Sequence, residues 1–493
     1  MTRKLFQWFD ERLGAASFAR KTLRKVFPDH WSFLIGEIAL YSFIILVITG
    51  TFLTFYYVPS ATTVVYHGPY RPLDGQQMSE AFASVMRISF QVKLGLLFRQ
   101  IHHWAALVMV GAVALHAARV FFTGAFRKPR DLNWVLGVVL LTLTIGIGVF
   151  GYSLPDDLLS GTGLRVIYSI VLSIPVVGTW LAFLVFGGAY PPPDLLERLF
   201  VLHVMILPGA IAAVLGLHLA MVWRQKHSNY PGKGLNDGLI RGERAWPRYA
   251  FKATGLFVAV FAVLALLAGV FQINPVWVYG PYSGYIASSG AQPDWYAGWL
   301  EGLVRLFPAW EFRGFGYEIA EPFFPGILLP GVFFTIMGLW PWIERRFTKD
   351  QRIHNVLQYP REVPLRTAIG VGAIAVVVML SIAGGSDVLA SYLGLNIEAA
   401  TKVMRALVIV VPLLAFAVAY LIARELKQSG VHPVRRSSML TVRRAPSGGF
   451  VYEEVERGGF KSVEERLEEA HEAAGGAAGG AAGGGTDLEE QHA

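Results

Sequence analysis

The residues that stand out chemically are histidines within long apolar stretches. His102 and His116 lie 14 positions apart, and His203 and His218 lie 15 apart. On an α-helix these separations place both imidazoles of each pair on one face, within roughly 40° and 60°, and about 21 Å and 22 Å apart in height. Two such helices side by side predict two stacked sites with two imidazoles each. Two axial imidazoles suit a six-coordinate electron-transfer haem.

A fifth histidine in these stretches, His103, does not share the spacing. It lies 13 positions from His116 and points roughly 140° away from it. We interpret His103 as a packing or hydrogen-bonding residue, which is also the common role of any single histidine inside a membrane. The repeated spacing therefore favours ligation at the other four positions, where polar groups are otherwise costly.

Glycines and arginines lie at matching heights. Arg99 and Arg119 are each three positions, or about one turn, from a histidine. Guanidinium groups suit carboxylates such as haem propionates, although arginines at helix ends also snorkel to the membrane surface. Glycine lets a backbone approach a porphyrin closely in a four-helix bundle. Two glycine pairs repeat the 14-residue spacing: Gly36 with Gly50, and Gly137 with Gly151.

The composition indicates a membrane protein without thiol chemistry. Of the 493 residues 54% are hydrophobic and 16% are charged, whereas soluble domains average about 25% charged. The absence of cysteine excludes disulfides, thiolate zinc sites, cysteine-ligated iron–sulfur clusters and covalently attached c-type haem. Eight stretches provide the roughly 20 apolar residues that span a bilayer. They are 33–58, 101–122, 134–154, 199–223, 249–271, 323–342, 365–382 and 403–422.

Basic residues set the expected orientation, because cytoplasmic loops collect lysine and arginine. With eight spans, the basic N-terminal segment and the basic loops after spans two, four and six fall on one side. A ninth apolar stretch, 164–185, would break this pattern if it crossed. We expect it to form an outer-surface hairpin broken at Pro175 and Gly178. The net charge of +8 then reflects topology, and we expect no nucleic-acid partner.

These patterns predict an all-α integral membrane protein with eight transmembrane helices. The tail turns basic, then acidic over 453–472, and ends in a Gly/Ala repeat, which is typical of a short solvated helix and a flexible end. We divide the chain into a cytoplasmic amphipathic segment (1–32), a di-haem four-helix bundle (33–248), a second four-helix half with a long outer loop (249–423) and a cytoplasmic tail (424–493).

Several motifs together resemble cytochrome b of the quinol:cytochrome c reductase complexes, over roughly residues 10–425. The haem helix reads Arg99-x-x-His102-x13-His116-x-x-Arg119, and Leu202-His203-x-x-x-Leu207-Pro208 precedes His218. Gly-Tyr-Ser-Leu-Pro at 151–155 and Ile-Pro-Val-Val-Gly at 174–178 are similar to the chloroplast branch. Pro-Asp-Trp-Tyr at 293–296 is a variant of the Pro-Glu-Trp-Tyr quinol motif. Leu-His-Leu-Ala at 217–220 and Gln-Lys-His at 225–227 resemble the actinobacterial proteins.

The resemblance implies a Q-cycle subunit with two non-covalent b haems. His102 and His203 would hold the low-potential haem near the outer face, and His116 and His218 the high-potential haem near the inner face. One electron from a quinol, by analogy menaquinol, would pass to a Rieske protein and the other through the haems to an inner quinone, generating proton motive force. The implied partners are a Rieske subunit, a cytochrome c subunit, membrane lipid, a second copy in a homodimeric complex, and a terminal oxidase as a further candidate in a supercomplex. The location would be a bacterial cell membrane, with both termini cytoplasmic.

Quinol oxidation needs a group that takes up a proton within hydrogen-bond reach. The resemblance implies Asp294 and Tyr296 for this role, with Tyr152 as a neighbour; aspartate is one methylene shorter than the family's glutamate. At the inner quinone site the resemblance fails, because Trp223 stands where mitochondrial members of the family have histidine and chloroplast members have arginine. The nearby candidates are Arg224, Lys226, His227 and Asp237.

Two other functions are compatible with the histidines. A di-haem membrane anchor of a hydrogenase or formate dehydrogenase would use all four, but it would not explain the second half with residues 293–296. A proton-coupled transporter would use intramembrane histidines as a relay and would contain no haem.

Overall fold

The computed structural model describes residues 22–28, 30–231, 236–238, 242–286, 292–314, 316–429, 438–444 and 450–456, together with residues 8, 10–12, 14 and 16. Within this part of the chain, eight helices are long and apolar enough to cross a membrane, as predicted. They are built on α3 (Leu34–Thr54), α5 (Gly95–Phe122), α6 (Asp131–Ser153), α10 (Leu207–Gln225), α11 (Ala250–Val270), α14 (Leu329–Thr348), α15 (Pro364–Gly384) and α17 (Ile397–Gln428).

Short segments lengthen several of these helices. Before α10 come α9 (Leu195–Val201) and the π-helical segment η3 (Leu202–Ile206). The segments η1 (Trp31–Phe33), η4 (Ala245–Tyr249) and η6 (Phe324–Leu328) precede α3, α11 and α14. A 21-residue helix is about 32 Å long at 1.5 Å per residue, which matches the hydrocarbon thickness of a bilayer.

The long helices present apolar side chains outward. Leu115 on α5 is 63% exposed, Phe251 on α11 is 70% exposed and Leu413 on α17 is 64% exposed. In water such surfaces would drive association. Lipid solvates them instead, so the apolar exterior follows from the same composition that predicts the spans.

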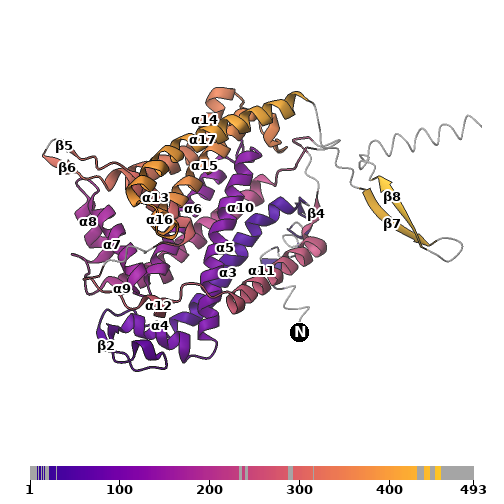
Figure 1. Cartoon of the computed structure of the whole chain (residues 1–493). Coiled ribbons are helices and arrows are strands. Elements are labelled where there is room, and N and C mark those ends of the chain that lie inside the picture. Colours follow the sequence, from indigo (N-terminus) through magenta and orange to yellow (C-terminus); the bar gives the residue numbers. More distant parts are fainter. Residues whose placement is uncertain are drawn as a thin grey trace, which may run out of the picture.

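The first half forms a four-helix bundle around the predicted histidines. Helix α3 packs on α5, α6 packs on α10, and α5 contacts α6. The second half surrounds this bundle: α11 packs on α3 and α5, α14 packs on α6, and α15 lies against α17 and α13 (Gly298–Leu306). In the view of Figure 1, α14, α15 and α17 lie above α3, α5 and α10, and α15 also contacts α5.

We call one end of the bundle the loop end, because the long connections gather there. It carries α4 (Glu80–Phe90), α7 (Leu158–Leu172), α8 (Gly178–Phe186), α12 (Val276–Tyr279), α13 and α16 (Ser386–Leu393) (Figure 1). The strand pairs β2 (Thr63–Val65) with β3 (Gln77–Ser79), and β5 (Phe312–Gly314) with β6 (Tyr317–Ile319), belong to the same connections. The stretch 164–185 is a helical hairpin, α7 and α8, broken at 173–177 as predicted.

The opposite end, which we call the basic end, carries the loops rich in lysine and arginine. There β1 (Val26–Phe27) pairs with β4 (Glu243–Arg244). The α14–α15 connection, which includes η7 (Pro360–Glu362), runs beside the chain that follows α10: the amide of Asn229 donates to Asn355 at 2.8 Å, and that of Leu357 donates to Asn229 at 2.7 Å. These backbone bonds join the two halves at the basic end.

The two terminal regions differ in how much of them is described. Half of the predicted N-terminal segment 1–32 and all of 457–493 lie outside the described residues. In the tail, β7 (Ser438–Arg444) and β8 (Phe450–Glu456) form an antiparallel hairpin. The predicted solvated helix is therefore wrong for 453–456, where cross-strand backbone pairing replaces helical bonds.

Candidate functional site

The four spaced histidines meet as two facing pairs inside the first bundle. The rings of His102 on α5 and His203 in η3 have centroids 6.1 Å apart, and those of His116 on α5 and His218 on α10 have centroids 6.5 Å apart. Two imidazoles that bind one metal ion from opposite sides, with bonds of about 2 Å, have ring centres about 6 Å apart. Both pairs therefore have the geometry of axial ligands, and a porphyrin is the usual source of the remaining ligands.

A π-helical turn aligns His203 with His218, the two ligand candidates that come from the same long helix. His203 lies within η3, where the hydrogen bonds connect residues five apart. Such a turn accommodates one additional residue, so the 15-residue separation between His203 and His218 acts like a separation of 14. The angle of roughly 60° expected between His203 and His218 holds only for a regular α-helix.

All four paired glycines lie against these imidazoles. A Cβ atom would come within 3.0 Å of His116 at Gly36 and within 3.1 Å of His102 at Gly50. At Gly151 it would lie 2.3 Å from His203, and at Gly137 it would lie 3.8 Å from His218. The 14-residue glycine spacing thus marks where α3 and α6 approach the histidines.

The loop-end imidazoles are oriented by hydrogen bonds. The Thr49 hydroxyl donates to the carbonyl of Ile45 at 2.8 Å, so its oxygen accepts from Nδ1 of His102 at 2.9 Å. Nδ1 of His203 donates to the carbonyl of Ile147 at 3.0 Å. Both rings then carry their proton on Nδ1, which leaves Nε2 free to bind a metal.

The basic-end imidazoles lack this support. Among the described residues, Nδ1 of His116 has no hydrogen-bond partner. His218 faces the backbone carbonyl of Asn133 without closing a hydrogen bond of ordinary geometry. The two pairs of ligand candidates therefore differ in their surroundings although they share the same ring spacing.

The two predicted arginines each keep one buried nitrogen without a partner among the described residues. Arg99 donates from Nη2 to the carbonyl of Asn274 at 2.6 Å, and its Nη1 is unpaired. Arg119 contacts the Ser32 hydroxyl at 3.4 Å through Nε, and its Nη2 is unpaired. An unpaired buried guanidinium nitrogen is costly, so each of these groups suits an anionic ligand such as a propionate.

The predicted quinol-site residues come together at the loop end. The hydroxyl of Tyr296, on η5 (Trp295–Ala297), interacts with the Asp294 carboxylate, and Tyr152 donates to the carbonyl of Gln292 at 3.2 Å. Burial and the Asp294 charge raise the pKa of Tyr296 well above its usual value. Tyr296 therefore stays protonated and acts as a donor, so that of the three predicted residues Asp294 is the one with the chemistry of a proton acceptor.

His103 takes part in this cluster. Its Nε2 lies 3.1 Å and 3.0 Å from the two carboxylate oxygens of Asp294. The hydrogen-bonding role predicted for His103 is confirmed, but the sequence did not reveal its partner. The partner lies 191 positions away, and the only available signal was that His103 points away from the other histidines.

A charged network without a sequence-assigned role lies next to this cluster. Arg305 on α13 donates to Glu301 at 2.9 Å and pairs with Asp387 at 2.9 Å. Gln292, two residues before Asp294, donates to Asp387 at 3.0 Å. Burial raises the pKa of Glu301. The network connects α13 and α16 to the segment that carries Asp294.

At the basic end the structure separates the four inner-site candidates. The Asp237 carboxylate accepts from the backbone amides of Asn355 and Val356 at 2.6 Å and 2.8 Å, so its role is to fix a loop. Arg224 and Lys226 are exposed. His227 is the candidate that packs inward, with its ring 5.0 Å from that of Phe27.

Three residues near the basic-end imidazoles, Ser32, Phe33 and Tyr230, are ones that the sequence analysis missed. Tyr230 contacts the Ser32 hydroxyl at 3.1 Å, and both lie beside Arg119, whose guanidinium stands 4.0 Å from the Phe33 ring. Burial and the nearby Lys25 charge lower the pKa of His227 to about 4. No α-helical periodicity marks Ser32, Phe33 and Tyr230, because they come from the short segment η1 and from the chain after α10.

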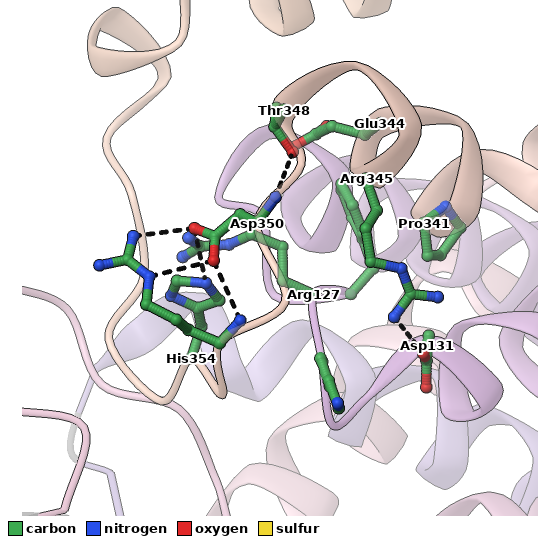
Figure 2. A pocket seen from close by; sticks show the side chains of 11 residues that line it. Arg127, Asp131, Pro341, Glu344, Arg345, Thr348, Asp350 and His354 are labelled. Carbon is green, nitrogen blue, oxygen red and sulfur yellow. Dashed lines mark hydrogen bonds and ion pairs between the residues drawn. The ribbon is translucent and has the colours of Figure 1, made fainter.

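A small cavity at the basic end lies between α6, α14 and the α14–α15 connection (Figure 2). Its volume of about 30 Å³ suits a water molecule and is too small for a quinone ring. Arg345 reaches Asp131 at 3.4 Å, and Asp350 pairs with Arg352 and His354 at 2.9 Å and 3.1 Å. The cavity is therefore part of an ion-paired joint between the halves.

Comparison with known proteins agrees with this architecture. Residues 107–281 match the family described as cytochrome b(N-terminal)/b6/petB. The cytochrome bc1 complex cytochrome b subunit of Mycobacterium leprae is 48% identical over 412 residues, which cover 83% of this chain and 75% of that protein. The subunits of the same name from Corynebacterium efficiens and Streptomyces coelicolor are 44% identical and cover 90% and 91% of this chain, and 82% of each relative.

A solved structure described as hyperthermophilic respiratory Complex III shares the fold. Its TM-score is 0.63 at 22% identity, and the match covers 86% of this chain and 99% of that chain. The sequence likeness extends through both halves of the molecule, which neither the hydrogenase-type anchor nor the transporter would explain. The chain belongs to the family of cytochrome b subunits of cytochrome bc1 complexes.

Proposed function

We propose that this cytochrome b subunit oxidises quinol at its loop end and reduces a quinone at its basic end, within a quinol:cytochrome c reductase. The observation that carries the proposal is the pair of facing imidazoles at each of two heights, with ring centroids 6.1 Å and 6.5 Å apart. Two redox centres stacked along one bundle provide a path for electrons from one end of the molecule to the other.

Two b-type haems fit the residues present. His102 and His203 would hold one, and His116 and His218 the other, with Arg99 and Arg119 pairing with the propionates. When bound, the haems supply one-electron transfer between the two ends. The protein supplies the tautomer of each imidazole, the glycine surfaces and the buried positive charge.

At the loop end Asp294 would accept a proton from quinol. Tyr296 would donate its hydroxyl hydrogen bond to that carboxylate or to the quinol oxygen, and Tyr152 would hold the preceding loop through Gln292. One of the two quinol electrons would leave to a Rieske protein docked at this end, and the other would pass towards the basic end. Protons would be released outside, because the basic loops at the other end favour a cytoplasmic location for that end.

At the basic end a quinone would bind near Arg119, Ser32, Tyr230 and His227. With its pKa lowered to about 4, His227 is neutral at physiological pH and can donate or accept a hydrogen bond. Proton uptake there and proton release at the loop end would together generate proton motive force. Both termini would be cytoplasmic, in a bacterial cell membrane.

The assembly partners follow from the relatives, which are named as subunits of a cytochrome bc1 complex. We propose a Rieske subunit and a cytochrome c subunit, a homodimer of the complex, and a terminal oxidase in a supercomplex. The actinobacterial relatives favour menaquinol as the substrate. The chain itself has no cysteine for an iron–sulfur cluster or c-type haem, so these must reside in other subunits.

Reduced-minus-oxidised spectra of the purified complex test the two-haem proposal. We expect His102→Ala to lose one b-type signal and His116→Ala to lose the other. His103→Asn, on the same helix and next to His102, is the matched control and should retain both. Loss of the same signal in both alanine variants would contradict the pairing, and absence of b-type bands in the native complex would contradict haem binding.

A further inference from the structure

The contact between His103 and Asp294 restrains where the Asp294 carboxylate can lie. Nε2 of His103 is within hydrogen-bond distance of both Asp294 oxygens, at 3.1 Å and 3.0 Å, and the two side chains are only 16% and 18% exposed. A charge-assisted contact of this kind restrains the position of the carboxylate. The carboxylate is thereby attached to α5, the helix that carries His102 and His116.

One face of α5 is built to hold the whole 294–297 segment. His103, Leu107 and Val110 follow the i, i+4, i+7 pattern of one helix face. Val110 forms a buried cluster with Tyr296 and Ala297, and Leu107 packs against that cluster. His103 provides the polar contact of this face and the other two residues provide apolar ones.

Gly111, next to Val110, also belongs to the contact. A Cβ atom there would lie 3.6 Å from the Trp295 ring, which is ordinary van der Waals distance. Trp295 therefore lies directly over the helix backbone. Asp294, Trp295 and Tyr296 thus each meet α5 or its packed neighbours, and the segment has a defined seat on that helix.

We propose that His103 is a positioning residue for Asp294, holding the carboxylate on the haem helix so that quinol must approach a fixed acceptor. The inference rests on the proposed role of Asp294. An aspartate has one methylene less than a glutamate, and a side chain this short reaches His103 without room for a wide swing. His103 acts through Asp294 and needs no contact with quinol.

The test uses two amide variants that differ only in reach. In His103→Gln the amide nitrogen can extend about as far as Nε2 of histidine, whereas in His103→Asn it is one methylene shorter. Quinol:cytochrome c turnover would be measured on the purified complex, with 2,3-dimethyl-1,4-naphthoquinol as the probe. We expect kcat to fall about tenfold in His103→Asn and to stay within about threefold of native in His103→Gln, the scale of one lost hydrogen bond.

Three further readouts separate positioning from a general structural role. KM for the quinol should change less than about twofold, because the hydrogen bond acts on the acceptor and not on quinol binding. Both b-haem signals should remain. His103→Asn should cause no additional loss in an Asp294→Ala background, since a residue that acts through Asp294 has nothing left to position.

The results separate the positioning role of His103 from the proton-accepting role of Asp294. Native turnover in His103→Asn would overturn the positioning role while leaving Asp294 as the acceptor. The same would follow if His103→Asn lowered kcat by the same factor in the native and the Asp294→Ala background. Equal loss in the glutamine and asparagine variants would also overturn it, because reach would then be irrelevant. Native turnover in Asp294→Ala alone would overturn the proposed role of that carboxylate, and the inference with it.

Discussion

The loop-end and basic-end imidazole pairs have nearly the same ring spacing but different hydrogen bonds. At the loop end, His102 and His203 both donate from Nδ1, to Thr49 and to the carbonyl of Ile147. At the basic end, Nδ1 of His116 has no partner among the described residues. A hydrogen bond from Nδ1 makes an imidazole a more basic ligand, which stabilises the oxidised metal and lowers its reduction potential.

With a haem bound at each imidazole pair, this difference would favour electron transfer from the loop end towards the basic end. If the loop-end haem has the lower potential, transfer to the basic-end haem is favourable and can proceed against an opposing membrane potential. The protein would achieve this with histidine at both sites, through the residues that hydrogen-bond to each imidazole. Four predictions test whether the two ends differ in this way.

The largest expected effect concerns the acceptance of a proton from quinol, a step that we assign to the loop end alone. In Asp294→Asn the side chain keeps its shape and loses its capacity to accept a proton. We expect quinol-driven cytochrome c reduction to fall by about 10²-fold or more. Reduction of the b haems by quinol entering from the basic end should persist, and stopped-flow spectroscopy separates the two routes.

The matched control for that substitution is Glu318→Gln. Glu318 lies in the same long connection, is exposed, and pairs with Arg313 at 3.3 Å. Turnover in this variant should be close to native. Equal slowing of both haem-reduction routes in Asp294→Asn would mean that the carboxylate serves the bundle as a whole and not the loop end.

The second prediction uses the unequal glycine contacts. A Cβ at Gly151 would lie 2.3 Å from His203, whereas one at Gly137 would lie 3.8 Å from His218. Overpacking of this kind costs about 1–3 kcal/mol. We expect Gly151→Ala to weaken or abolish the loop-end haem signal, and Gly137→Ala to perturb the basic-end signal less. Similar losses in both variants, measured by redox titration of the b bands, would contradict this asymmetry.

The sequence predicted the spans, the hairpin and the four ligand candidates, because each depends on local periodicity. It did not predict the π-turn at Leu202–Ile206, since the insertion of one residue leaves the apolar pattern intact. It also missed the contacts of His103 with Asp294 and of Arg305 with Asp387, which join distant segments. Conversely, Asp237 looked like a site residue and binds backbone amides instead.

The third prediction concerns acid. Burial and the nearby Lys25 charge lower the pKa of His227 from about 6.5 in the unfolded chain to about 4. Between these values the unfolded chain binds more protons, so acidification destabilises the basic end by up to about 1.4 kcal/mol per pH unit. At the loop end burial raises the pKa of Glu301. The folded chain then binds this proton more readily than the unfolded chain, so acidification stabilises the loop end through Glu301.

Haem retention from pH 7 to pH 5 tests this contrast. We expect the basic-end signal to be lost first on acidification, and His227→Phe to reduce that loss because the replacement removes the titrating group and keeps the ring. A basic-end signal that is as acid-sensitive in His227→Phe as in the native complex would assign the sensitivity to another group.

The smallest expected effect comes from removing a hydrogen bond to a loop-end imidazole. Thr49→Val removes the hydroxyl oxygen that accepts from His102, leaves the ring's interaction with the backbone of Leu46, and preserves the shape of the side chain. His102 then becomes a weaker donor ligand, so the potential of the loop-end haem should rise by tens of millivolts, given that 1 kcal/mol corresponds to about 43 mV for one electron. The matched control is Thr144→Val on α6: this hydroxyl donates only to the carbonyl of Leu140 among the described residues, and both potentials should stay in place. Potentiometric titration decides the matter: an unchanged loop-end potential in Thr49→Val would mean that hydrogen bonding to Nδ1 does not set the difference between the two ends.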